Sequence, residues 1–121
     1  MTDAIFAFDE HTEIDTVYII DQPHHNTLAT IYRQKGDPQW TLKIRFRQLR
    51  DDKVWDSKDS KRVLEGTGSL EQLHSAMDEN VKAAFLLGAE VHVLPVHGGT
   101  DELQRVMSTV PGAHTKMEWL H

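Results

Sequence analysis

The stretch WTLKIRFRQL, residues 40–49, alternates apolar and polar side chains without interruption over its first eight positions. Trp40, Leu42, Ile44 and Phe46 are expected on one face of a strand, with a threonine and three basic residues on the other. Strict alternation of this kind predicts a strand with one buried and one solvated face, as in an antiparallel sheet. The rest of the fold is predicted outward from this strand.

A second strand is predicted immediately before it, over residues 27–33 (TLATIYR), with a Lys-Gly-Asp-Pro turn between the two. Glycine permits a positive φ and proline fixes φ, which is typical of tight reversals. The hairpin register that joins the apolar faces places Ile31 opposite Leu42 and Ala29 opposite Ile44. A shift of one residue would separate the two apolar sets, so we expect this register.

The flanking segments extend the sheet. Residues 16–21 (TVYIID) are rich in β-branched and aromatic side chains and predict a first strand, which ends before a proline. Residues 62–67 (RVLEGT) are a candidate fourth strand, whereas residues 1–13 are expected to form a loose or docked arm. The N-terminal half therefore predicts an antiparallel β-meander of three or four strands.

The C-terminal half predicts alternating helices and strands. Ser69 and Gln72 have the spacing of a capping box, which predicts a helix start. That helix is expected to end at Gly88, and its apolar stripe is predicted to comprise Leu70, Leu73, Met77, Val81, Ala84 and Phe85.

Residues 89–96 predict the next strand, and Thr100 is expected to cap a second helix. Residues 114–119 are a candidate last strand. The predicted fold class is α+β in a single domain, residues 1–121, with the meander followed by α-β-α-β. Both helices are expected on one face of a mixed sheet.

Composition excludes several functional classes. The 121 residues include no cysteine, which rules out disulfides, thiolate metal sites and thiol nucleophiles. No apolar run approaches the roughly 20 residues of a membrane-spanning helix, and the N-terminus is acidic, unlike a signal peptide. A cytoplasmic protein without membrane contact is therefore expected, and no cofactor is indicated.

Charge is distributed unevenly along the chain. The formal net charge is −6, yet residues 33–62 carry ten bases against five acids. The basic side chains of the sheet face and their apolar neighbours are typical of a protein interface. The candidate interface residues are Leu28, Tyr32, Lys43, Arg45 and Arg47. The expected partner is a second copy of the chain or another protein, and a pI near 5.7 argues against nucleic acid. A simpler interpretation is that oppositely charged segments neutralise each other within the fold.

A second candidate site lies where a predicted strand meets a helix, at His97-Gly98-Gly99-Thr100. Free N–H groups and the helix dipole favour an anion at such a position, and a histidine can transfer a proton. The alternative is that the glycines only form the turn. His92, His24 and His25 are further candidates for this pocket.

No histidine pair has the i, i+4 spacing of a helical zinc site, and no serine has a Gly-x-Ser-x-Gly context. A metal site is therefore not predicted, and an enzyme has no positive signature. The sequence favours a non-enzymatic binding module with a protein interface on the charge-polarised sheet face. The alternative is a small enzyme or small-ligand-binding domain with its pocket at the His97–Thr100 turn.

Overall fold

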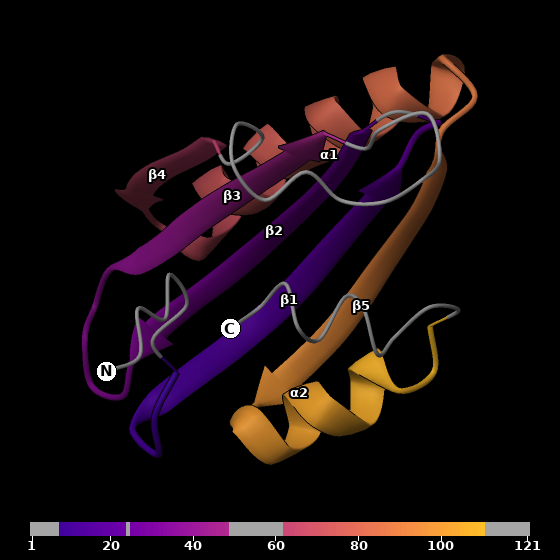
Figure 1. Ribbon diagram of the computed structural model, residues 1–121. Coiled ribbons are helices and arrows are strands. Elements are labelled where there is room, and N and C mark those ends of the chain that lie inside the picture. Colours follow the sequence, from indigo (N-terminus) through magenta and orange to yellow (C-terminus); the bar gives the residue numbers. More distant parts are fainter. Residues whose placement is uncertain (1–7, 24, 49–61, 111–121) are drawn as a thin grey trace.

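A computed structural model describes residues 8–23, 25–48 and 62–110, which form a five-stranded sheet and two helices (Figure 1). The α+β class is therefore confirmed. The elements in chain order are β1 (Thr12–Asp21), β2 (His25–Gln34), β3 (Trp40–Gln48), β4 (Arg62–Gly68), α1 (Leu70–Leu86), β5 (Glu90–Gly98) and α2 (Thr100–Met107). The predicted strand at 114–119 and residues 1–7 of the predicted arm lie outside the described residues.

The strand order is β4-β3-β2-β1-β5, so the four strands of the meander are consecutive neighbours. Helix α1 then carries the chain back across the sheet, and β5 pairs with β1 at the opposite edge (Figure 1). All described strand pairs are antiparallel, which corrects the prediction of a mixed sheet. The reason is geometric: one helical crossover makes β5 run in the direction of β4, which is opposite to that of β1.

The hairpin register predicted from the alternating pattern is confirmed. Ile31 pairs with Leu42 and Ala29 pairs with Ile44. Both faces of this sheet are buried over much of their area. A register shift of one residue would therefore move the side chains of each core to the opposite face.

Strand β1 begins four residues earlier than predicted and is buried along most of its length. It is central, between β2 and β5, and its register shifts at a bulge between Ile14 and Thr16. Val17 and Ile19 belong to one core, whereas Tyr18 belongs to the other. The run Val-Tyr-Ile-Ile is apolar at every position because both faces of β1 are covered.

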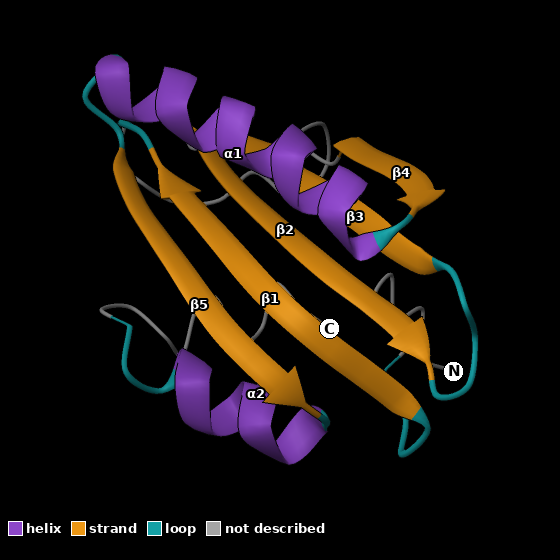
Figure 2. Ribbon diagram, turned by 180° about the vertical axis from the view of Figure 1, so that it is seen from behind, coloured by secondary structure: helices purple, strands orange, loops and turns teal. Residues whose placement is uncertain are grey.

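The two helices lie on opposite faces of the sheet, which corrects the prediction that they share one face. Leu73 and Met77 of α1 pack in the core that contains Tyr18. Leu103 and Met107 of α2 pack in the core that contains Val17, Ile19 and Leu28. Figure 2 shows α1 lying over the strands, with α2 beside β5 at the sheet edge. A sheet that is apolar on both faces needs a cover on each.

The helix starts differ from each other. The predicted capping box of α1 is confirmed, because the Ser69 hydroxyl accepts from the Gln72 N–H and the Gln72 side chain accepts from the Ser69 N–H. In contrast, the N-cap of α2 is Gly99 rather than Thr100, and the Gly99 N–H donates to Glu102 Oε1 at 2.9 Å. Gly99 has no side chain that could accept from the first N–H groups of α2, and the Glu102 carboxylate satisfies the N–H of the N-cap residue itself.

None of the helices described here is long and apolar enough to cross a bilayer.

Candidate functional site

Asp15 lies at the bulge of β1 and organises a hydrogen-bond network on the α1 side of the sheet. Its side chain is only 7% exposed. Asp15 Oδ2 lies 2.6 Å from His74 Nε2 and accepts from the Thr16 hydroxyl at 2.7 Å. The Tyr18 hydroxyl lies 2.7 Å from the other ring nitrogen of His74, Nδ1. For a neutral His74 ring, these contacts fit a tautomer that donates from Nε2 to Asp15 and accepts at Nδ1 from Tyr18.

Burial keeps the Tyr18 hydroxyl in its protonated form. Burial raises the pKa of Tyr18 to about 12, and the negative charges of Asp78 and Asp15 add to this effect. Tyr18 is therefore a stable hydrogen-bond donor across the physiological range rather than a proton acceptor.

His97 reaches the same carboxylate from the end of β5. Its Nδ1 lies 3.4 Å from Asp15 Oδ1, and its side chain is 69% exposed. The backbone of His97 has φ +49°, in the left-handed region that non-glycine residues adopt infrequently. One buried carboxylate is thus shared by histidines from α1 and β5, a juxtaposition that neither sequence position indicates by itself.

The glycines that follow His97 have a local structural role. A Cβ atom at Gly98 would lie 2.6 Å from the Glu102 side chain, which folds back over the turn. Because Glu102 already accepts from the Gly99 N–H, a carboxylate of the chain itself occupies the predicted anion position. Thr100 is the first residue of α2.

The structure does not gather the other predicted histidines around His97. His92 pairs with Glu90 at 2.9 Å and lies opposite Ile19, on the α2 side of the sheet. His25 begins β2 at the other end of the sheet, its side chain is not described, and His24 lies outside the described residues. In the described ranges, no three histidine or acidic side chains are grouped so that they could hold a metal ion.

The predicted basic interface is largely internal. Leu28 is 0% and Arg45 2% exposed, and burial lowers the pKa of the Arg45 guanidinium. Lys43 pairs with Glu65 at 3.3 Å, and Tyr32 packs edge-to-face against Phe8. The alternation of apolar and polar side chains in a strand identifies its polar face, but it does not show whether the rest of the fold covers that face. The Arg47 side chain lies outside what the structure describes.

A different surface exposes apolar side chains. Phe85, Leu86 and Leu87, at the end of α1, are 69%, 79% and 79% exposed, and Val93 of β5 is 47% exposed. The tight turn at Gly88 (φ +85°) places the end of α1 beside the start of β5 (Figure 2). We call these four residues the β5 edge surface. The prediction that Phe85 belongs to the buried stripe is wrong, because the last turn of α1 leaves it exposed.

The β5 edge surface had a sequence signal that the helical pattern obscured. Three consecutive large apolar residues cannot all face one side of a helix, since successive residues are about 100° apart. Phe-Leu-Leu at 85–87 therefore predicts exposed apolar area, which in natural proteins marks interaction sites.

No family model matches the chain, and it matches no curated protein and no solved structure.

Proposed function

We propose that the chain is a non-enzymatic protein-binding module that self-associates through the β5 edge surface. The observation that carries this proposal is the run of three exposed apolar side chains, Phe85–Leu87, beside an edge strand. Contiguous apolar exposure is uncommon on monomeric proteins and is typical of interfaces.

The pattern of β5 supports a second copy as the partner. Among the described strands, only β1 pairs with β5, so no described strand pairs with the outer edge of β5. An edge strand of this kind can accept a further strand. Pro95 has no N–H, which confines regular pairing to residues 90–94. This is also the half of β5 that lies beside Phe85–Leu87.

Self-pairing of residues 90–94 is chemically complementary. In an antiparallel pair of β5 strands centred on His92, Val91 of each copy lies opposite Val93 of the other. Both valines lie on the α1 side, opposite Ile20 and Tyr18 of β1. Apolar β-branched pairs of this kind stabilise antiparallel sheets, and the exposed ends of both α1 helices would flank them.

Sedimentation velocity over a wide concentration range tests the proposal. Val93→Lys and Phe85→Glu should each weaken self-association by about tenfold or more, because each buries a charge at the interface. Gln104→Lys, at an exposed position of α2, is the matched control and should leave it unchanged. A monomer at every concentration would show that self-association is wrong.

A second candidate function, a small enzyme or ligand-binding site at His97, is favoured by the Asp15–His97 pair. A carboxylate that orients one ring nitrogen leaves the other available as a proton acceptor. Backbone strain such as the positive φ of His97 is concentrated at functional sites. His97→Asn, which tolerates a positive φ, should then slow hydrolysis of p-nitrophenyl acetate, while His11→Asn should not. Equal rates in both variants would eliminate this candidate.

A further inference from the structure

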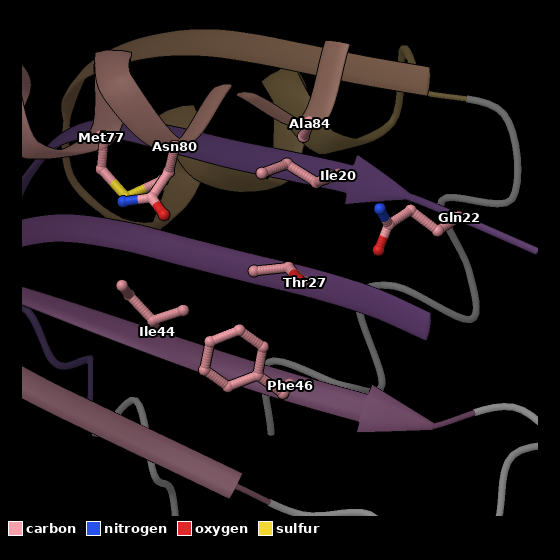
Figure 3. Close-up of a pocket in the computed structure, with 8 residues that line it drawn as sticks. All are labelled: Ile20, Gln22, Thr27, Ile44, Phe46, Met77, Asn80 and Ala84. Carbon is pink, nitrogen blue, oxygen red and sulfur yellow. The ribbon is translucent and has the colours of Figure 1, made fainter. Parts of the chain in front are cut away.

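A pocket of about 150 Å³ lies between the second half of α1 and the ends of β1, β2 and β3 (Figure 3). Its apolar walls come from both layers, with Ile20, Ile44 and Phe46 from the sheet and Met77 and Ala84 from the helix. A cavity of about this volume accommodates one benzene-sized ring.

Three polar side chains surround the same space, namely Gln22, Thr27 and Asn80 (Figure 3). The Asn80 amide nitrogen donates to the Ala76 carbonyl at 2.9 Å, which fixes the orientation of the side chain. Neither the Gln22 amide nor the Thr27 hydroxyl makes a side-chain hydrogen bond to another described residue. The pocket therefore offers donors and acceptors on otherwise apolar walls, the combination typical of small-molecule sites.

We infer that this pocket binds a small neutral molecule consisting of one aromatic ring with a hydroxyl group. The volume sets the size at one ring. All eight described lining residues are uncharged, so an ionised ligand would lose its hydration without a compensating charge. The Thr27 hydroxyl and the two amides can form hydrogen bonds with one ligand hydroxyl. A pure hydrocarbon would leave these three groups without a partner in the ligand.

The pocket is separate from the β5 edge surface, with which it shares no residue. Ala84 faces the pocket, and the next residue, Phe85, is exposed at the end of the helix. Variants can therefore be chosen that change one site without replacing a residue of the other.

Phenol is the probe, titrated into the full chain below the concentration at which the chain associates and followed by amide chemical shifts. With seven heavy atoms, phenol should bind with a Kd of about 1 mM or below. The shifts should be largest around Thr27, Met77 and Ala84. Benzoate, which has a similar ring but a negative charge, should produce at least tenfold weaker binding.

Two neighbouring alanines of α1 offer a matched pair of variants. Ala84→Leu fills the pocket and should weaken phenol binding at least tenfold, whereas Ala83→Leu places the same side chain on the exposed side of the helix and should leave the Kd unchanged. Thr27→Val keeps the shape of the side chain and removes the hydroxyl. It should weaken phenol binding severalfold, and it keeps the test decisive if Ala84→Leu does not fold.

Three outcomes would overturn the inference. These are the absence of phenol shifts at the lining residues, benzoate binding as tight as that of phenol, and an equal loss of binding in the two alanine variants. Shifts confined to another face of the sheet would equally show that the ligand site lies elsewhere.

Discussion

His74 Nε2 lies 2.6 Å from Asp15 Oδ2, although 59 residues separate the two in the chain. This contact joins the second turn of α1 to the bulge of β1. Because Tyr18 and Thr16 complete the hydrogen bonds of the pair, the network anchors α1 on the sheet in addition to the apolar contacts of Leu73 and Met77.

Replacing the shared carboxylate should destabilise the fold. Asp15→Asn removes the charge that faces His74 and His97, and we expect the free energy of unfolding in urea to fall by about 1.5–3 kcal/mol. The exposed substitution Glu79→Gln serves as the control and should change it by less than about 0.5 kcal/mol. A loss for Asp15→Asn no greater than that of the control would mean that the network contributes nothing to stability.

Stability should fall in alkaline solution because of Tyr18. Its pKa is about 12 in the folded chain against 10.0 for an ordinary tyrosine, so the unfolded chain loses this proton first. The contribution of Tyr18 is complete below pH 10 and disappears as the pH rises through about 12. Absorbance at 295 nm should show one tyrosine ionising near pH 12, and Tyr18→Phe should abolish that transition. Ionisation of Tyr18 near pH 10 would contradict its burial.

Truncation of two leucines of α1 should have very different effects on stability. Leu73 is 7% exposed and packs on the sheet, so Leu73→Ala should lower the free energy of unfolding by about 2–4 kcal/mol. Leu86 is 79% exposed, and Leu86→Ala should change it by less than about 0.5 kcal/mol. Measurements in urea at a concentration where the chain is monomeric separate this effect from self-association. Similar losses for both leucines would place the helix in a different rotation on the sheet.

The turn before α2 should show coupling between Gly98 and Glu102. Glu102→Ala removes the acceptor of the Gly99 N–H and should cost about 1 kcal/mol. Gly98→Ala alone should also destabilise, because its Cβ would meet the Glu102 side chain. In a Glu102→Ala background that clash is absent, so a double-mutant cycle should give a coupling of about 0.5–1 kcal/mol. Additive effects would show that Glu102 moves aside at no cost.

Features determined by neighbouring residues were predictable from the sequence. The pairing of Ala29 with Ile44 follows from alternation on two strands joined by a short turn. The Ser69–Gln72 capping box involves residues three positions apart. In both cases the interacting groups are close in the chain, so their types and spacing contain the necessary information.

Features that require distant segments were missed. No sequence motif marked Asp15 or His74 as part of a site, because the two side chains meet only when α1 packs over β1. Arg45 alternates like a solvated residue, yet it is 2% exposed. Phe85 continues the helical stripe, yet it is 69% exposed.

Short-range patterns were sufficient to predict the α+β class, the register of the β2–β3 hairpin and the start of α1, because periodicity and capping involve residues close in the chain. Contacts between distant segments set which face each helix covers, which polar side chains are buried, and that Asp15 lies beside two histidines. Those outcomes depend on the path of one crossover helix, which brings β5 to the free edge of β1. No local pattern encodes that path, since it minimises the exposed apolar area of the whole sheet rather than of any one segment.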